Sequence, residues 1–432
     1  MTVRAGRRVG KICLRIVFVL SFFLVGMASA APPPEVVVKN MDSNGDGRIS
    51  QSEWLKPIKI FKRIDANHDG YVVASEIAAF RGEKRADDKT PESTPDVTPV
   101  NLSNVTRPED GWIDVHFHLV GDKDDLQGFD EIAQRALDIM KQNGMSRIVV
   151  MPPPRPHYNF DIESIAALAK KYGPRISVMA GGGSLNPMMQ EYGNLKEVPD
   201  DVLKKFRAIA EDILARGAKG FGEIGVHHVS LNPTHGYESV PADNPLMRVL
   251  AEVAGEHDVP IDMHFDPVPK DSKRPGWITS EKNPPVFREN ITALDRLLDA
   301  YPKTRIIWAH AGSDPVGWYD PGLVKKMLKK HPNLYFSIRA VAPPPRKPVW
   351  NRKDGINNSW IRVFRKYPDR FVLGTDSFVV TDNYAGAAQA PLIFQEKSAI
   401  QRQGENELLR YLEKDVRRKI AYENAMRLYH LD

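Results

Sequence analysis

The 432-residue sequence contains one cysteine, Cys13, in the basic and apolar stretch that begins the chain. Without that stretch the protein has no disulfide and no thiolate ligand, so a metal site must use histidine and carboxylate side chains. Long hydrophobic runs are also scarce: residues 16–27 form the main one, shorter than the roughly 20 residues that a membrane-spanning helix needs. A Gly-x-Gly-x-x-Gly pattern does not follow the first strand of the large domain, which argues against an open doubly wound sheet.

Residues 1–30 have the three parts of a secretory signal peptide: a basic start, the apolar run and the small-residue cleavage site of residues 28–30. An uncleaved membrane anchor is the alternative, and the short apolar run argues against it. The segment holds five of the 60 lysines and arginines and none of the 55 acidic residues, so the mature chain has no net charge. We therefore expect a periplasmic or secreted protein without a membrane span and without general attraction to nucleic acid.

Two acidic twelve-residue segments within residues 31–82 match the calcium-binding loop of EF-hands and resemble the compact EF-hand pairs of exported bacterial proteins. Each has oxygen ligands at alternate positions, a glycine at position six and a glutamate at position twelve. At position nine of the second loop Val73 offers no side-chain oxygen, so a water is expected to supply that ligand. We predict two calcium ions, bound by Asp42, Asn44, Asp46, Arg48 (carbonyl), Ser50 and Glu53 in the first loop and by Asp65, Asn67, Asp69, Tyr71 (carbonyl) and Glu76 in the second.

Residues 83–110 are polar, aperiodic and rich in Pro, Ser and Thr, which predicts a linker before a large domain at 111–432. That domain begins with residues 112–119, whose polar and apolar residues alternate as in a strand, with Asp114, His116 and His118 on one face. Two histidines spaced this way have Cα atoms about 6.5 Å apart and can converge on one ion.

Seven more strand-like runs follow, most of them separated by helix-like runs. Asp130 is predicted to cap the first of these helices and Gly144 to end it. This alternation over some 320 residues predicts an α/β fold, a (β/α)8 TIM barrel preceded by a small all-α EF-hand domain. The later strands are predicted at about 146–151, 175–181, 219–224, 260–265, 304–310, 333–338 and 370–376.

In such barrels the chemistry lies at the C-terminal ends of the strands. A single histidine after an apolar strand is usually a hydrogen-bonded core residue. Here four histidines and two carboxylates share these ends, which predicts a site for a divalent transition metal. The six residues are His116, His118, Glu223, His264, His310 and Asp376.

These motifs, with the closing residues 424–429, resemble the amidohydrolase superfamily and most closely its amidohydrolase-2 branch, over residues 111–432. The resemblance implies a metal-dependent TIM-barrel hydrolase. It implies that His116, His118 and Asp376 hold one ion, that His264 and His310 complete the site or hold a second ion, and that Glu223 bridges. Many binuclear relatives have a carboxylated lysine on strand four instead of a glutamate, so one ion and two ions both remain open.

The ligand types favour zinc, with manganese and iron as alternatives. A cation lowers the pKa of a bound water toward about 7, and Asp376 is predicted to accept the proton of that water and return it to the leaving group. His310 is expected to polarise the substrate carbonyl or to hold a second ion. Arg339, at the end of strand seven, is the candidate for binding a substrate carboxylate, and an ion pair with a loop acid is its alternative.

Other residues are expected around the site. Asp114 and Asp262 are predicted to share the face of the ligands and either to orient their imidazoles or to form ordinary hydrogen bonds inside the barrel. The remaining residues near the strand ends are expected at the rim, and two long loops are expected to shape the pocket. These are His157, His227 and His228 at the rim, and Trp277 and Trp350 in loops 266–290 and 340–356.

Three functions follow from these residues. The first is hydrolysis of a C–O or C–N bond in a small molecule, such as a lactone, ester or amide. The second is metal-dependent decarboxylation of an aromatic or unsaturated acid, and the third is a catalytically inert, calcium-dependent binding protein. A complete ligand set argues against the third function, and release of carbon dioxide would separate the second from the first.

Overall fold

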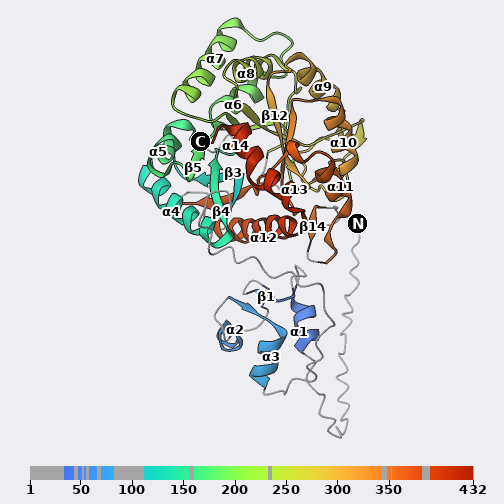
Figure 1. Cartoon of the computed structure of the whole chain (residues 1–432). Coiled ribbons are helices and arrows are strands. Elements are labelled where there is room, and N and C mark those ends of the chain that lie inside the picture. The colour runs from blue at the N-terminus through green and yellow to red at the C-terminus, as the bar shows by residue number, and fades with distance from the viewer. Residues whose placement is uncertain are drawn as a thin grey trace, which may run out of the picture. The chain divides into compact units, whose positions relative to one another are not determined.

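The computed structural model describes two compact units, within residues 1–97 and 98–432 (Figure 1). The predicted signal peptide and the predicted linker lie outside the described residues. In the part of the chain that is described, no helix has the length and apolar character needed to cross a membrane. The described residues are 34–42, 47–50, 53–54, 58–65, 70–81, 111–154, 160–231, 236–341, 348–351, 353–381 and 390–431.

The N-terminal unit has three short helices, α1 (Pro34–Met41), α2 (Ile58–Ile64) and α3 (Ala74–Arg81), drawn in blue in Figure 1. Two short strands, β1 (Ile49–Ser50) and β2 (Tyr71–Val72), pair antiparallel and join the two predicted calcium loops. This pairing adds a strand element to the all-α domain that the sequence predicts. Apolar residues of the helices and of both strands, including Val38, Ile49, Phe61, Val72 and Ile77, form a small buried core.

Backbone contacts close both predicted calcium loops. Of the predicted ligands, Asn44, Asp46, Asn67 and Asp69 lie outside the described residues. The first and the last acidic residue of each loop accept a hydrogen bond from a backbone N–H of the same loop, which is the compact turn that the glycine at position six allows. These bonds join Gly47 to Asp42 at 2.7 Å, Gly70 to Asp65 at 3.2 Å, Ser50 to Glu53 at 2.9 Å and Val73 to Glu76 at 3.1 Å.

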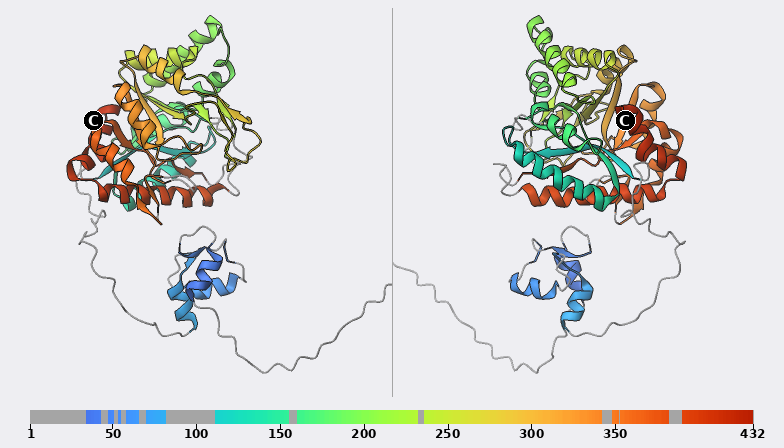
Figure 2. Two further views of the ribbon diagram at one scale, coloured as in Figure 1. Left: turned by 90° about the vertical axis from the view of Figure 1, so that its right-hand side faces the viewer. Right: turned by 60° about the vertical axis from the view of Figure 1, so that its left-hand side comes forward.

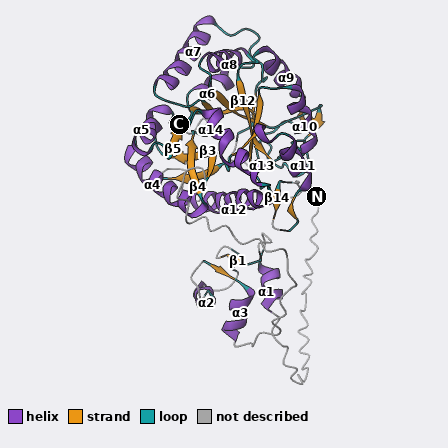
Figure 3. Cartoon of the chain, in the orientation of Figure 1, coloured by secondary structure: helices purple, strands orange, loops and turns teal. Residues whose placement is uncertain are grey.

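The C-terminal unit is a barrel of parallel strands surrounded by helices (Figure 3). Two strands separated by Met179 form one interrupted barrel strand, and the ring closes there, which leaves eight strand positions. The predicted TIM barrel is thus confirmed. The strands are β3 (Trp112–Val120), β4 (Met145–Val150), β5 (Ile176–Val178) with β6 (Ala180–Gly181), β7 (Phe221–His228), β9 (Pro260–Phe265), β12 (Arg305–Ala311), β13 (Leu334–Ile338) and β16 (Phe371–Leu373), and β17 (Ser377–Val380) extends the last beside β3.

The helices lie around the strands, and Figure 2 shows the long α12 running along one side of the unit. Short antiparallel additions follow some barrel strands and build the loops above them: β8 (Glu238–Ser239), the pair β10 (Ser272–Lys273) and β11 (Val286–Phe287), and the pair β14 (Trp350–Asn351) and β15 (Gly355–Ile356). The helices are α4 (Leu126–Asn143), α5 (Ile162–Tyr172), α6 (Leu185–Tyr192), α7 (Asp200–Ala215), α8 (Pro245–Glu256), α9 (Ile291–Ala300), α10 (Pro321–Lys330), α11 (Asn358–Lys366), α12 (Ala390–Tyr411), α13 (Lys414–Arg418) and α14 (Asn424–Tyr429).

Helix α4 begins earlier than the sequence predicts. Asp125, not Asp130, caps it by accepting a hydrogen bond from the backbone N–H of Gly128 at 2.8 Å. The apolar stripe of the helix starts with the buried Phe129, so the cap must lie before that residue. Asp130 instead pairs with Lys171 on the helix surface. Gly144 ends the helix in the left-handed conformation with a φ of 67°, as predicted.

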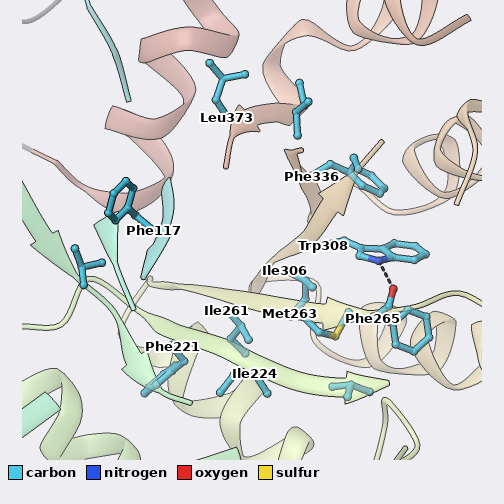
Figure 4. Packing of buried hydrophobic residues seen from close by; sticks show 14 of the residues in the cluster. Phe117, Phe221, Ile224, Ile261, Met263, Phe265, Ile306, Trp308, Phe336 and Leu373 are labelled. Carbon is cyan, nitrogen blue, oxygen red and sulfur yellow. Dashed lines mark hydrogen bonds between the residues drawn. The ribbon is translucent and has the colours of Figure 1, made fainter. Parts of the chain in front are cut away.

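Two apolar layers hold the barrel. The outer layer lies between strands and helices and contains Trp308, whose indole N–H donates to the carbonyl oxygen of Phe265 at 2.7 Å (Figure 4). The inner layer lies among strands from different sides of the barrel and includes Val149, Ile307 and Val372. Tyr429 of α14 packs into this inner layer, so the end of the chain contributes to the barrel interior.

A bulge in β3 decides which residues reach the site. The register of β3 with β4 shifts between Asp114 and Phe117, so the alternation of side chains moves by one residue. Val115 therefore packs in the inner layer and Phe117 in the outer layer. The prediction that Asp114 shares the face of the two histidines is wrong, because the bulge lies between them. Its carboxylate accepts hydrogen bonds from the backbone N–H and the hydroxyl of Thr375, which lies between β16 and β17.

Candidate metal centre

Four of the predicted ligands form a first group of donor atoms. The Nε2 atoms of His116 and His118, both on β3, lie 3.1 Å apart. Glu223 Oε2, from β7, lies 3.4 Å from the first of these nitrogens and 3.5 Å from the second. Asp376 Oδ1, from the segment after β16, lies 3.1 Å from the Nε2 atom of His118. Three barrel strands therefore deliver donors to one point.

The other carboxylate oxygen of Glu223 belongs to a second group. Glu223 Oε1 lies 2.6 Å from Nδ1 of His264 on β9 and 3.1 Å from Nε2 of His310 on β12. These two histidine nitrogens lie 3.1 Å from each other. Glu223 thus faces both groups, one with each oxygen, which is the geometry of a bridging carboxylate.

The spacing of the donor atoms fits a metal ion. Zinc binds histidine nitrogen at about 2.05 Å in a tetrahedron, whose ligand atoms are then about 3.3 Å from one another. Most distances within the two groups are 3.1–3.5 Å and lie close to this value, whereas the contact of Glu223 with His264 is shorter, at 2.6 Å, and that of His116 with Asp376 is longer, at 3.9 Å. Three sets of donor atoms among the described residues each lie within 4.8 Å of one another: those of His116, His118 and Glu223, of His116, His310 and Asp376, and of Glu223, His264 and His310. The donors are nitrogen and carboxylate oxygen, the types that suit zinc, manganese and iron.

The charges of the cluster also fit a cation. Burial raises the pKa of Glu223, but the charge of His116 and the imidazole hydrogen bonds outweigh it and hold this pKa well below its ordinary value. Burial likewise opposes ionisation of Asp376, yet Arg339 and then His118 hold its pKa far below the ordinary value. Both carboxylates are therefore ionised at neutral pH, in a buried place that requires positive charge beside them.

The imidazoles supply that positive charge when no ion is bound. Burial lowers the pKa of His264, but Asp266 and Glu223 raise it to about 10. Burial also lowers the pKa of His116, and Asp262 and Glu223 reverse this and raise it well above its ordinary value. A bound cation would replace those protons, since a histidine ligand must be neutral.

Residues behind the ligands fix the orientation of the rings. Asp262, as the sequence predicts, lies inside the barrel with Oδ1 3.1 Å from Nδ1 of His116. The carbonyl oxygen of Met151 lies 2.8 Å from Nδ1 of His118. Each contact leaves the Nε2 atom of its ring facing the first group, which is the arrangement that second-sphere partners give to metal-binding histidines.

Two of the predicted ligands have unusual backbone conformations. His310 and Asp376 have φ values of 66° and 55°, in the left-handed region that non-glycine residues rarely occupy. Such conformations cost on the order of 1–3 kcal/mol and gather at functional sites, where the surrounding structure imposes them. Gly374, two residues before Asp376, lets this segment approach β3 closely, because a Cβ atom at this position would lie 2.8 Å from Cβ of His116.

Arg339 lies beside the cluster. Its Nη1 atom lies 3.2 Å from Asp376 Oδ2 and 3.3 Å from Ser313 Oγ. The acid that it pairs with is therefore a predicted metal ligand and not a remote loop residue. The side chain is 24% exposed, so it can reach a molecule that enters from solvent.

The predicted rim residues have different positions. His227 is buried and lies between the carbonyl oxygen of Asp266 and the hydroxyl of Tyr237, so it supports the loops. The half-buried ring of His228 lies 4.1 Å from that of His264, at the edge of the second donor group. His157 lies outside the described residues.

The two loop tryptophans also differ. Trp277 is 47% exposed, and its indole N–H donates to the carbonyl oxygen of Pro315 at 3.0 Å, which fixes it beside the loop that follows β12. Trp350 is buried in β14 and its backbone N–H donates to Ala340. Trp277 is thus the one of the two that is presented to solvent.

Some residues of the centre escape prediction from the sequence. Asp266 lies just beyond the end of β9, with Oδ2 3.7 Å from Nε2 of His264. Its spacing of two residues from that histidine was the available signal. Arg402 and Glu405 of α12 are buried behind the centre. The only signal for them in the sequence is that two charged residues lie about one helical turn apart.

A family model described as amidohydrolase matches residues 113–431. The chain belongs to the amidohydrolase family. It is a metal-dependent hydrolase-type enzyme, so the catalytically inert alternative is wrong. An EF-hand model matches residues 39–56 and 58–80, which identifies the N-terminal unit as an EF-hand pair.

Solved structures similar to this amidohydrolase include an amidohydrolase 2 from Bifidobacterium longum subsp. infantis (14% identity, 74% of this chain and 99% of that chain, TM-score 0.37). A TatD homologue from Escherichia coli has 15% identity over 74% of this chain and 99% of that chain, with a TM-score of 0.42. A phosphotriesterase from Mycobacterium tuberculosis has 12% identity over 75% and 95% of the two chains, with a TM-score of 0.45. No curated protein matches the chain significantly.

Proposed function

We propose that this amidohydrolase hydrolyses a C–O or C–N bond, in a lactone, ester or amide, with two divalent ions. His116, His118 and Asp376 would hold one ion, His264 and His310 the other, and Glu223 would be a ligand common to both. The observation that supports it most strongly is the carboxylate of Glu223, whose two oxygens face two separate histidine groups. When bound, zinc or a similar ion supplies an activated water at neutral pH and polarises the bond to be cleaved. Zinc is the proposed metal because the donors are nitrogen and oxygen without sulfur.

Asp376 is the proposed general base. Its Oδ1 atom lies in the first donor group, 3.1 Å from the Nε2 atom of His118, and its Oδ2 atom faces Arg339. The carboxylate is ionised at neutral pH and can accept the proton of the attacking water, then return it to the leaving oxygen or nitrogen. His310, with His264, would hold the second ion on the other side of Glu223.

Arg339 is the proposed substrate-binding residue. Its guanidinium is partly exposed beside Asp376, and its Nε atom is buried without a hydrogen-bond partner among the described residues. A substrate carboxylate could take two parallel hydrogen bonds from such a group. We therefore propose a substrate with an anionic group close to the scissile bond.

The calcium loops and export complete the proposal. We propose two calcium ions in the EF-hand pair with a structural role, and processing after Ala30 that places the mature protein in the periplasm or outside the cell. The oxygen ligands at all positions of the two loops except that of Val73 and the signal-like residues 1–30 support this.

The test is metal analysis of the mature protein combined with a substrate screen. Lactones, esters and amides that bear a carboxylate are compared with the same compounds as neutral methyl esters, and aromatic acids are included. Hydrolysis that requires the bound transition metal supports the proposal. Release of carbon dioxide from the aromatic acids, without hydrolysis of any ester, lactone or amide, would instead favour decarboxylation.

A site variant and a control variant together distinguish the loss of metal binding from a general loss of folded structure. His116→Ala with His118→Ala removes two donors of the first group, so transition-metal content and turnover should fall together. His331→Gln is the control, because this buried histidine bonds to Asp295 among the outer helices, with Nε2 2.6 Å from Oδ1. A full complement of barrel metal in the double variant would contradict the assignment of the first group.

A further inference from the structure

The two residues that flank Asp376 in the sequence belong to a buried chain of hydrogen-bonded polar side chains. Thr375 and Ser377, its neighbours in sequence, are both fully buried, and their hydroxyl oxygens lie 2.6 Å apart. The Thr375 hydroxyl also lies 2.5 Å from Asp114 Oδ2, and Arg402 Nη1 of α12 lies 3.0 Å from the hydroxyl of Ser377. The chain thus runs from an acid on β3 to a base on α12.

The number of available protons determines which group donates in each hydrogen bond of this chain. A hydroxyl has a single proton to donate, and Asp114 as a carboxylate can only accept. The proton of Thr375 therefore goes to Asp114, that of Ser377 goes to Thr375, and Arg402, which can only donate, supplies Ser377. Every hydroxyl then has one donor and one acceptor, and the two ends carry opposite charges.

The same carboxylate also fixes the backbone of two predicted ligands. Asp114 Oδ1 accepts from the backbone N–H of His116 at 3.2 Å and from that of Thr375 at 3.0 Å. The backbone N–H of Asp376 donates to the carbonyl oxygen of His116 at 3.0 Å. The bulge in β3 and the left-handed turn at Asp376 are thereby joined through one buried acid.

Helix α12 does not need this chain in order to pack. Glu405 accepts from the backbone N–H of Ala340 at 2.9 Å, and the amide side chain of Gln401 bonds to both the N–H and the carbonyl of Val341. The Ser398 hydroxyl accepts from Phe378 N–H at 2.9 Å. Loss of one hydroxyl from the chain leaves these contacts in place, so its effect should be local.

We propose that Asp114, Thr375, Ser377 and Arg402 form a positioning array that sets Asp376 against His116 and so determines the affinity of the first donor group for its ion. None of the four residues belongs to either donor group. The inference rests on the proposed function, because it takes the first donor group to be a metal site.

The experiment compares Thr375→Val, which removes one hydroxyl and keeps the shape, with Thr375→Ser, which keeps the hydroxyl. Zinc affinity is measured by chelator competition, and the visible absorption of the cobalt-substituted protein reports the geometry of the ligands. Thr304→Val is the matched control: this buried hydroxyl donates to the carbonyl oxygen of Ala251 at 2.5 Å and belongs to neither donor group.

Loss of a partner behind a metal ligand typically lowers metal affinity by about 10- to 100-fold. We expect a loss of this size and an altered cobalt spectrum in Thr375→Val, recovery in Thr375→Ser and no change in Thr304→Val. Ser377→Ala should repeat the effect and serves if Thr375→Val does not fold. Wild-type affinity and spectrum in the hydroxyl-deleted variants would overturn the array while leaving the proposed function intact. A wild-type barrel that binds no transition metal would overturn both.

Discussion

Glu223→Gln tests the shared carboxylate. The substitution keeps the shape of the side chain, but it removes the negative charge and replaces one oxygen with an amide nitrogen that cannot bind a metal. In the native geometry Oε1 lies 2.6 Å from His264 Nδ1, and Oε2 lies 3.4 Å from His116 Nε2. Whichever way the amide turns, one of the two groups loses its oxygen ligand.

The magnitude follows from the burial of the site. Glu223 is 3% exposed, and removing one partner of a buried charge pair costs about 3–5 kcal/mol. Since each 1.4 kcal/mol is a factor of ten, metal affinity should fall by about 10²- to 10⁴-fold. After dialysis against a weak chelator, we expect the metal content to fall from about two ions per barrel to one or none, as measured by elemental analysis.

Glu405→Gln provides the matched control. This glutamate is also fully buried, and burial raises its pKa well above the ordinary value. Its Oε1 atom accepts from Ala340 N–H, which a glutamine oxygen can also do. The control should retain wild-type metal content. Two tightly held ions in Glu223→Gln would refute the bridging role.

Three further outcomes are expected. Asp376→Asn should lower turnover by about 10²- to 10⁴-fold, measured under metal-saturating conditions, and near-normal turnover would place the general base elsewhere. Glu53→Gln combined with Glu76→Gln should abolish binding of about two calcium ions, measured by calorimetry, while the barrel keeps its turnover; a large loss of turnover would show that the units are coupled. Trp308→Phe should destabilise the barrel by about 2–4 kcal/mol in urea unfolding, because it leaves a cavity and an unpaired carbonyl at Phe265, and unchanged stability would contradict the packing described.

The barrel and its donor set could be predicted because both depend on local patterns repeated along the chain. Alternating strand and helix signals give the eightfold order, and parallel strands bring their C-terminal ends to one side. Residues such as His264 and His310 are therefore neighbours in space, although 46 positions separate them.

The geometry inside the site was harder to predict, because it depends on one-residue shifts and long-range contacts. The bulge after Asp114 turns its side chain away from the ligands, and no residue pattern in β3 marks it. Asp125, and not Asp130, caps helix α4. Several acidic residues precede the helix, and the buried packing of Phe129 determines which of them lies at its first turn. Arg402 lies nearly 290 positions from Asp114, so only the fold places both on one polar chain.

The central claim is that Glu223 bridges two ions at the C-terminal end of the barrel. A crystal of the zinc-loaded protein, measured at the zinc absorption edge, tests it directly. Two anomalous peaks are predicted about 3.5–4 Å apart, one beside His116 and His118 and the other beside His264 and His310, with the carboxylate of Glu223 between them. A single peak, or peaks away from these histidines, would contradict the claim.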